Sequence, residues 1–232
     1  KAREILDALG EVREAPPGRA GLMDAVGECE VLITRFGHRI DRELFAAAPR
    51  LRALVSATTG LDHIDLETAT ESGVEVLSLQ GETEFLEGLS ATAELAWGLL
   101  LAVLRHIPQA SQSVKEGGWD RDAFRGNELR DKRLGILGLG RLGRMVAEYG
   151  RAFGMAVAAH DPCLDDWPED VESHPSLEAL LEDTQVLSIH VPLSEETKGM
   201  IDETQLARLP DGAVLINTSR GAVVDEAALL AA

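Results

Sequence analysis

LGILGLGRLG, residues 134–143, is the stretch that most clearly indicates the fold of this chain. An apolar run is followed there by three spaced glycines, where a helix begins. The glycines are Gly138, Gly140 and Gly143, in the pattern GxGxxG. The first permits a tight turn, the second leaves room for a pyrophosphate because it has no Cβ, and the third lets helix and strand pack closely. The free N–H groups at the helix start favour an anion. The stretch therefore predicts a dinucleotide-binding turn.

The residues after this turn decide between that interpretation and a plain glycine-rich loop. Helical apolar spacing predicts a helix from Arg141 to about Phe153, and places Arg141 and Leu142 beside the glycines as candidate cofactor contacts. The next apolar strand ends at Asp161, where a carboxylate would accept hydrogen bonds from the adenosine ribose and repel a 2′-phosphate. No arginine follows directly, so the sequence predicts NAD rather than NADP.

Composition indicates a globular chain. The 232 residues, 45% of them hydrophobic, can form one large or two modest domains. The formal net charge of −18 disfavours nucleic acids and anionic membranes as partners, because phosphate binding needs a basic surface. The apolar stretch 91–108 contains charged residues and predicts a buried or interfacial helix rather than a membrane span. No targeting motif is visible, so the cytoplasm is the expected location.

The two cysteines carry no recognisable chemistry. Cys29 and Cys163 lie far apart, outside any CxxC or histidine-ligand spacing. We therefore expect free thiols, no disulfide framework and no metal.

Strands alternate with helices along nearly the whole chain, which predicts parallel sheets covered on both faces. The predicted strands are 31–34, 53–56, 74–77, 134–137, 155–159, 186–189 and 213–216. The predicted helices are 2–9, 41–48 with Asp41 as N-cap, a short one from 65, 91–106, and a second running to about 117. We expect one domain over 1–90 and a Rossmann dinucleotide-binding domain over 91–232.

Two further motifs complete a family pattern. They are VLSIHVPLSEETKGMI at 186–201 and VLINTSRGAVVDEAAL at 214–229. With the glycine-rich turn, they make the chain resemble the D-isomer specific 2-hydroxyacid dehydrogenases over about residues 53–232. The resemblance implies two Rossmann-like or flavodoxin-like doubly wound domains flanking a cleft. It also implies an NAD-dependent oxidoreductase that transfers a hydride between NAD(H) and a small D-2-hydroxyacid or 2-oxoacid, with residues 1–90 as the substrate domain.

The resemblance assigns further cofactor contacts at strand ends. His190, Val191 and Pro192 would lie near the adenosine, and Asn217, Thr218 and Ser219 near the nicotinamide. The general rule that ligands bind beyond the carboxyl ends of parallel strands agrees. His190 is interpreted as a packing or cofactor-contact residue rather than an acid.

Arg220 matches the catalytic arginine of the family. A planar, permanently charged guanidinium can hold the carboxylate of a 2-oxoacid and polarise its carbonyl. An arginine outside such a motif is more often part of a surface ion pair. Because Arg220 follows an apolar strand within NTSRG, we predict the catalytic role.

The loop SATTGLDHID matches the substrate loop of the family. Thr58, Thr59 and Gly60 would offer backbone N–H groups to the substrate carboxylate, as an anion nest does. A tight strand-to-helix turn that needs Gly60 for its backbone angles explains the same residues without a ligand. His63 matches no catalytic position and is interpreted as a supporting or surface residue.

In the family, the acid/base histidine and the glutamate that orients it lie downstream of the motif that contains Arg220. No such residues occur before Ala232. We therefore expect residues 1–232 to be part of a longer polypeptide, in which a later segment that returns to the first domain carries both groups. Residues 1–232 by themselves are expected to bind NAD with negligible turnover.

The substrate and the partners stay open at this point. The substrate loop SATTGLDHID contains no lysine or arginine, which favours glyoxylate, hydroxypyruvate or a similar small acid. Arg35, Arg39 and Arg52 could still bind a phosphate, so phosphoglycerate stays a possible substrate. An NAD-sensing corepressor-like binding protein and an inactive paralogue are the alternatives from other classes. The helix 91–106 is apolar on more than one face, which fits either packing across a two-fold axis or burial inside one chain. The resemblance to the family favours the first, a homodimer.

Overall fold

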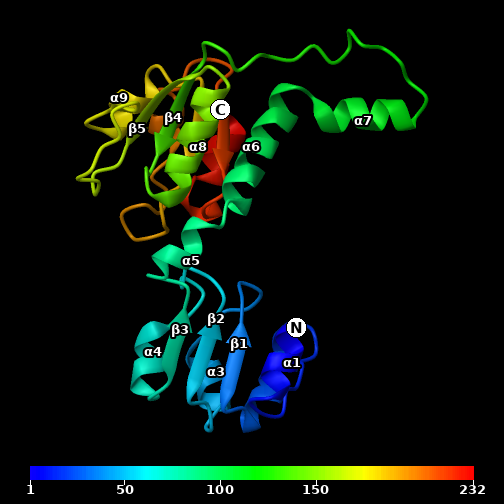
Figure 1. Cartoon of the computed structure of the whole chain (residues 1–232), viewed down its shortest axis with the longest axis vertical. Coiled ribbons are helices and arrows are strands. Elements are labelled where there is room, and N and C mark those ends of the chain that lie inside the picture. Colours follow the sequence, from blue (N-terminus) through cyan, green and yellow to red (C-terminus); the bar gives the residue numbers. More distant parts are fainter. The chain divides into compact units, whose positions relative to one another are not determined.

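Two compact units make up the structure. The computed structural model describes all 232 residues, and the chain divides into unit 1, Lys1–Leu86, and unit 2, Glu87–Ala232. Each unit is built around its own parallel sheet (Figure 1). Two parallel-sheet α/β regions are therefore present, as the sequence predicted. The assignment of the substrate role to 1–90 and of the cofactor role to 91–232 stays a prediction.

Unit 1 contains a three-stranded sheet in the order β1-β2-β3. Its strands are β1 Val31–Thr34, β2 Ala53–Ser56 and β3 Glu75–Ser78. Its helices are α1 Ala2–Asp7, α2 Gly18–Ala25, the 3-10 helix η1 Val26–Glu28, α3 Arg42–Ala47 and α4 Leu66–Glu71, and α5 Thr83–Glu87 crosses the boundary to unit 2.

Local capping explains where the two helices between these strands begin. The Asp41 carboxylate accepts a hydrogen bond from the backbone N–H of Leu44 at 3.2 Å, and the Asp65 carboxylate accepts one from Thr68 at 2.9 Å. Such acceptors satisfy N–H groups that have no partner inside the helix. Gly73, with φ of +67°, lies just past the end of α4. The helix starts predicted from Asp41 and Asp65 are confirmed.

The sheet of unit 1 is covered on one face only, which corrects the expectation of two covered faces. Leu54 is fully buried against the α2, α3 and α4 side chains. Val31, Ile33 and Leu77, on the other face, are each about half exposed, at 52%, 50% and 46%. Because successive side chains of a strand point to opposite faces, one row lies in the core and the next row in solvent.

Unit 2 contains a five-stranded parallel sheet in the order β6-β5-β4-β7-β8. Its strands are β4 Arg133–Leu137, β5 Ala156–His160, β6 Glu172–Ser173, β7 Val186–Ile189 and β8 Val214–Asn217. Its helices are α6 Ala91–Leu104, α7 Ile107–Lys115, α8 Arg141–Ala152, α9 Leu177–Leu181, α10 Glu203–Leu206, the 3-10 helix η2 Gly221–Val223, and α11 Glu226–Ala231. The direction of winding reverses at β4, which pairs with both β5 and β7. Such a reversal is where open α/β sheets bind ligands.

Close packing of α8 on β4 depends on glycine. A Cβ on Gly150 would lie 2.6 Å from Leu134 Cδ2, and a Cβ on Gly143 would collide with the carbonyl oxygen of Gly138. Val146 and Ala147, each 1% exposed, fill the contact between these glycines. The strand-turn-helix unit predicted from the glycine spacing is thus present.

The long apolar helix keeps much of its surface exposed. The stretch Thr83–Leu104, which contains α5 and α6, is long and apolar enough to cross a membrane by length and composition alone, and 22% of its most apolar part is buried. Ala93, Trp97 and Leu100 pack into the core of unit 2. After a left-handed residue, His106 with φ of 52°, α7 begins with Pro108 in its first turn. Proline is accepted there because its missing N–H would have no helical partner.

Most predicted elements lie within one or two residues of the observed ones. The strands β3, β5 and β8 begin and end one residue later than predicted. The helix α2 and the two-residue edge strand β6 were not predicted. A two-residue strand has no periodicity to detect, and α2 begins at Gly18 directly after Pro16 and Pro17, a sequence that usually indicates a loop.

Candidate functional site

Three segments singled out in the sequence follow three neighbouring strands at the same level of the sheet in unit 2. Leu137 pairs with Ile189, and Ile189 pairs with Asn217. The glycine-rich turn, the HVP segment and the TSR segment begin at the next residue of each strand. Their backbones therefore lie together at the carboxyl edge of β4, β7 and β8.

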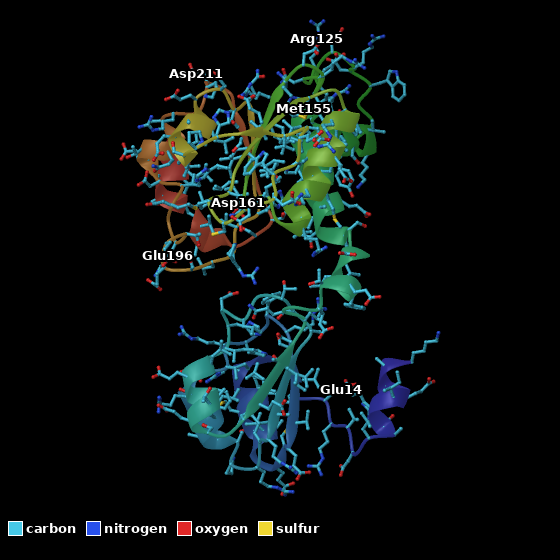
Figure 2. All side chains as sticks on the ribbon, turned by 60° about the vertical axis from the view of Figure 1, so that its left-hand side comes forward. Glu14, Arg125, Met155, Asp161, Glu196 and Asp211 are labelled. Carbon is cyan, nitrogen blue, oxygen red and sulfur yellow. The ribbon has the colours of Figure 1, made fainter.

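Figure 2 shows the two ends of unit 2. Asp161 follows β5 and Glu196 lies in the segment after β7, and both lie at the same end of the unit. Asp211, which precedes β8, lies at the opposite end. The two labelled acidic residues at the first end thus mark the carboxyl edge of the sheet.

The glycine-rich turn has the shape that a diphosphate needs. Gly138 has φ of +89°, and a Cβ there would lie 3.0 Å from the backbone nitrogen of Val191. A Cβ on Gly140, in contrast, would meet nothing within 4 Å. The first glycine therefore fits the turn against the HVP segment, and the second leaves an open space in front of the helix.

The start of α8 has donors without protein acceptors. Gly140 is the N-cap residue and no side chain caps the helix, so the N–H groups of the first turn are unsatisfied. Arg144 is the first residue whose N–H bonds back into the helix, to Gly140 O at 2.9 Å. Open N–H groups and the helix dipole favour an anion at this place. These residues fit the diphosphate of a dinucleotide.

The side chains of Arg141 and Leu142 face the protein. The Arg141 guanidinium donates to the carbonyl oxygen of Leu89 at 2.6 Å, and Leu142 packs against the core of unit 2. Any contact of these two residues with a dinucleotide would therefore come from their N–H groups.

Asp161 connects the end of β5 to the glycine-rich turn. Its Oδ2 accepts a hydrogen bond from Leu139 N at 2.8 Å, and its Oδ1 accepts one from Cys163 N at 3.0 Å. Each carboxylate oxygen keeps further acceptor capacity for a ligand hydroxyl. The carboxylate therefore holds the turn in place as well as presenting a negative charge beside it. Sequence spacing indicated only the second property.

His190 is held as a neutral imidazole. It is partly buried at the end of β7, and burial lowers its pKa from 6.5 to about 4. Its Nε2 is 2.8 Å from Ser188 Oγ, and its backbone nitrogen donates to Leu137 O at 2.8 Å. A histidine with this pKa is uncharged near neutral pH and is a poor proton donor there. The interpretation of His190 as a packing or cofactor-contact residue agrees with this environment.

The turn after β8 is closed by Asn217. Its Oδ1 accepts from Ser219 N at 2.9 Å and from Ser219 Oγ at 2.8 Å, and its Nδ2 donates to Arg220 O at 2.9 Å. The Ser219 hydroxyl hydrogen is thus directed into the protein. Thr218 Oγ1, in contrast, is buried and has no hydrogen-bond partner within the chain. A buried hydroxyl in this state suits a polar ligand group.

In unit 1, the predicted substrate loop follows the middle strand. The N–H groups of Thr58, Thr59 and Gly60 make no hydrogen bond within the chain. The buried Thr58 side chain fixes the turn, because its Oγ1 lies 2.7 Å from Ser56 Oγ and donates to Gly60 O at 2.9 Å. A turn with three open N–H groups can bind a carboxylate.

His63 supports this loop from the side. Its Nε2 lies 3.4 Å from Ser56 Oγ, and its ring meets the Phe36 ring edge-on at 5.1 Å between centroids. Ile40 N donates to His63 O at 2.8 Å, which joins the segment after β1 to the loop. Ser56 and Ser188 are the supporting residues that sequence analysis missed. Both are polar residues at or near the end of an apolar strand, a signal that could have identified them.

The three arginines considered for a phosphorylated substrate differ in position. Arg35 follows β1 and thus lies at the carboxyl edge, where the Thr58 loop also lies. Arg39 follows in the same connecting segment. Arg52 precedes β2 and lies at the opposite edge. Arg52 is therefore not a candidate for that loop.

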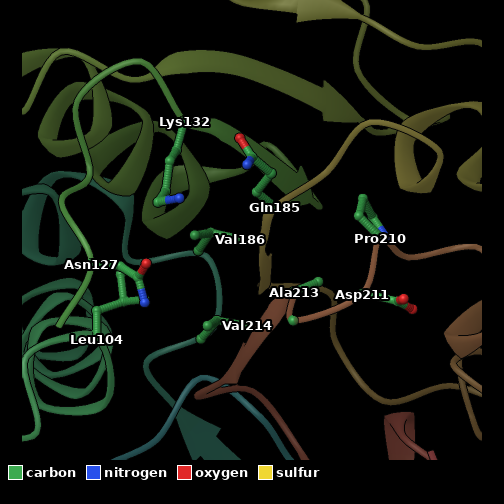
Figure 3. A pocket seen from close by; sticks show the side chains of 10 residues that line it. Leu104, Asn127, Lys132, Gln185, Val186, Pro210, Asp211, Ala213 and Val214 are labelled. Carbon is green, nitrogen blue, oxygen red and sulfur yellow. The ribbon is translucent and has the colours of Figure 1, made fainter. Parts of the chain in front are cut away.

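A cavity of about 280 Å³ lies at the other edge of the sheet in unit 2 (Figure 3). Lys132, Gln185 and Ala213, among the residues that line it, directly precede β4, β7 and β8. Because ligands of open parallel sheets bind beyond the carboxyl ends, this cavity is separate from the predicted cofactor site.

Comparison with known families gives two matches that together span the chain. The D-isomer specific 2-hydroxyacid dehydrogenase, catalytic domain, matches residues 1–117, and the NAD binding domain of the same family matches residues 97–232. The resemblance that the sequence motifs indicated is confirmed. The prediction of NAD as the cofactor is confirmed with it.

Curated relatives carry several names. The chain is 38% identical over 90% of its length to a hydroxypyruvate reductase of Thermotoga maritima, of which it covers 66%. It is 39% identical over its whole length to a glyoxylate reductase of Aeropyrum pernix, of which it covers 72%. It is 35% identical over 98% of its length to a D-3-phosphoglycerate dehydrogenase of Methanocaldococcus jannaschii, of which it covers 43%. The chain thus spans about two thirds or less of two of these relatives.

Solved structures agree on the fold. A formate dehydrogenase of Staphylococcus aureus in complex with NAD matches 99% of this chain with a TM-score of 0.86 at 27% identity, and the chain covers 69% of it. A D-lactate dehydrogenase of Aquifex aeolicus, complexed with NAD and lactic acid, matches 89% of this chain with a TM-score of 0.76 at 31% identity, and the chain covers 61% of it.

Proposed function

Because this chain belongs to the D-isomer specific 2-hydroxyacid dehydrogenases, we propose that it forms the substrate-loop and NAD-binding part of an enzyme that interconverts a small D-2-hydroxyacid and its 2-oxoacid. The observation that supports this most is the common level of the three segments after β4, β7 and β8. That level puts the diphosphate turn and Arg220 at one edge of one sheet.

The residues of unit 2 would hold the cofactor and one end of the substrate. The N–H groups of 140–143 bind the diphosphate, Asp161 binds the adenosine ribose, and Thr218 Oγ1 binds a polar group near the nicotinamide. The bound cofactor supplies the hydride for C2 of the acid. The Arg220 guanidinium holds the substrate carboxylate and polarises the carbonyl, where a charged, bidentate donor stabilises developing negative charge.

Other residues would complete the reaction. The open N–H groups of Thr58, Thr59 and Gly60 bind the substrate carboxylate from unit 1. The proton donor would be a histidine that a glutamate orients, and no residue of 1–232 matches either group. We therefore expect residues 1–232 by themselves to bind NADH with negligible turnover.

The test is a set of assays at the NADH absorbance band with the full-length protein and glyoxylate, hydroxypyruvate and phosphohydroxypyruvate. We expect turnover of at least one acid. Arg220→Ala lowers kcat/KM by about 10³-fold, the loss typical of one transition-state donor. The proposal is wrong if no oxoacid is reduced, or if Arg220→Ala leaves kcat/KM unchanged.

Among the three acids, we favour the unphosphorylated ones. The loop over residues 57–63 has no lysine or arginine, and a phosphate would need a cation there. Arg35, at the same edge, is the residue that would serve a phosphorylated acid. An Arg35→Ala variant that loses activity on phosphohydroxypyruvate but keeps activity on glyoxylate would reverse this preference.

The choice of NAD over NADP is assigned to Asp161. Its carboxylate beside the turn would repel a 2′-phosphate. Asp161→Ser is expected to weaken NADH binding by about tenfold and to improve NADPH binding, because each 1.4 kcal/mol changes a dissociation constant tenfold. Titration of both cofactors by fluorescence measures the two constants.

A second copy of the chain is proposed as the partner. Leu95, Leu99 and Val103 form one exposed apolar stripe along α6, at 57%, 41% and 52% exposure, and Trp119 beyond α7 is 91% exposed. A stripe of this kind on a symmetric partner buries itself against its copy. Leu99→Glu should convert the dimer to a monomer in sedimentation at micromolar concentration, whereas Leu229→Glu, on an equally exposed leucine of α11, should not.

A further inference from the structure

We propose that Asn217 is a positioning residue for Arg220, acting through the fold of the turn that both residues share. The inference rests on the proposed function, because it assigns to Asn217 the task of holding the guanidinium at the carboxyl edge of the sheet. No ligand contact of Asn217 itself is needed.

The side-chain amide of Asn217 uses both of its ends within four residues. Ser219 N can only donate, so the atom 2.9 Å from it is the amide oxygen. The amide nitrogen then faces Arg220 O, which can only accept, at 2.9 Å. The hydrogen-bond partners fix the orientation of this amide without ambiguity.

The backbone of Asn217 is itself fixed. Asn217 is the last residue of β8 and pairs with Ile189 of β7, whose side chain is fully buried. The amide therefore projects from a rigid strand end, and it transmits that position to the next three residues. A shorter side chain such as serine cannot reach both Ser219 N and Arg220 O, and aspartate lacks the donor.

Arg220 is held from its other side as well. Its carbonyl oxygen also accepts from Val223 N at 3.1 Å, in η2. Val223 is fully buried, and its own carbonyl accepts from Ile201 N at 3.1 Å. The carbonyl of Arg220 thus receives one donor from the strand end and one from the 3-10 helix, and the Arg220 guanidinium itself donates to Ser219 O at 3.1 Å.

Loss of the amide would release one of these two supports. Arg220 O would keep the bond from Val223, but the turn would lose the bonds that set the direction of the Arg220 Cα–Cβ vector. Small displacements of a group that orients the substrate reduce rates by up to about 10²-fold. We therefore expect Asn217→Ala to lower kcat/KM for the oxoacid by about 30- to 100-fold.

A double-mutant cycle in the full-length protein separates positioning from general stability. The variants are Asn217→Ala, Arg220→Ala and the two combined. If Asn217 acts only through Arg220, the combined variant has the kcat/KM of Arg220→Ala within about twofold, because coupled groups are not additive. Multiplied losses in the combined variant, or an unchanged kcat/KM in Asn217→Ala, would overturn the inference.

Two further variants guard against trivial outcomes. Asn217→Asp keeps acceptors for Ser219 and loses only the donation to Arg220 O. It replaces Asn217→Ala if that variant fails to fold. A wild-type kcat/KM in Asn217→Asp contradicts the proposal. Asn127→Ala removes the other asparagine of the chain, at the opposite edge of the sheet, and leaves kcat/KM unchanged. If Arg220→Ala itself retains full activity, the proposed function fails and not the positioning role alone.

Discussion

The turn after β4 in unit 2 and the turn after β2 in unit 1 have the same place in two different sheets. Each follows the middle strand of its sheet at the carboxyl end, and each leaves backbone N–H groups without protein acceptors. They differ in what shapes them. The first is shaped by Gly138 and Gly143, where a side chain has no room, and the second by the hydroxyl of Thr58, which bonds to Ser56 and Gly60.

Each turn also has a histidine beside it, and that histidine lies within hydrogen-bond distance of a serine in the strand that precedes the histidine. His190 Nε2 lies 2.8 Å from Ser188 Oγ, and His63 Nε2 lies 3.4 Å from Ser56 Oγ. The comparison teaches that an anion-binding turn can be built either by steric exclusion or by side-chain hydrogen bonds. The two constructions should respond differently to mutation.

The largest effect on cofactor binding is expected at Gly143. In Gly143→Ala the new Cβ meets the carbonyl oxygen of Gly138, so the turn and α8 must move apart. Overpacking of this kind costs about 1–3 kcal/mol of unfolding free energy. We expect the dissociation constant of NADH to rise by about 100-fold, equal to about 2.7 kcal/mol. Urea unfolding and NADH titration measure both quantities.

Gly140→Ala is the matched control, because a Cβ there meets nothing within 4 Å. The unfolding free energy should stay at the wild-type value, while NADH binds about tenfold more weakly because the methyl group occupies the space assigned to the diphosphate. Wild-type NADH affinity in Gly140→Ala would place the diphosphate elsewhere.

The difference between the two constructions explains what the sequence revealed. Steric exclusion leaves a fixed spacing of glycines, so the turn around Gly138 and the helix from Arg141 could be predicted from residues alone. The Thr58 turn depends on which hydroxyl meets which acceptor, and that follows from the three-dimensional path of the chain rather than from spacing. Its role was therefore available only through resemblance to a family, as was the role of Arg220.

The supporting residues show the same limit. Ser188 and Asn217 lie in strands that are predicted from their apolar residues. The alternation of side chains along a strand does not indicate that a polar side chain will form a hydrogen bond with a residue two or three positions later. The small shifts of β3, β5 and β8 have a related cause, since pairing in the sheet fixes a strand end more than composition does.

The next prediction concerns the unfolding free energy at acidic pH and His190, which lies beside the glycine-rich turn of unit 2. Burial lowers the pKa of His190 from 6.5 to about 4, so the unfolded chain binds this proton more readily than the folded chain. The stabilising contribution is fully present above pH 6.5 and is lost as the pH falls towards 4. The loss amounts to about 3 kcal/mol, at 1.36 kcal/mol for each pKa unit.

The pH dependence of urea unfolding between pH 7 and pH 4.5 tests this. His190→Gln should flatten that part of the slope, because glutamine does not titrate and can still bond to Ser188. An unaltered slope in His190→Gln would show that another group causes the loss.

The smallest effect on stability is expected at Thr58, in the turn after β2, and it tests whether the two turns bind different ligands. Thr58→Val keeps the shape of the side chain but removes the hydroxyl, which leaves Ser56 Oγ and Gly60 O each without one partner. Loss of a buried hydrogen-bond partner costs about 1–3 kcal/mol of unfolding free energy. We expect a value near the lower limit, because Ser56 Oγ and Gly60 O can find other partners. The turn should loosen and the KM for the oxoacid should rise several-fold, while the dissociation constant of NADH stays unchanged. Thr59→Val, at an exposed position of the same turn, should leave the unfolding free energy unchanged. If Thr58→Val weakens NADH binding as strongly as Gly143→Ala, the two turns do not serve separate ligands.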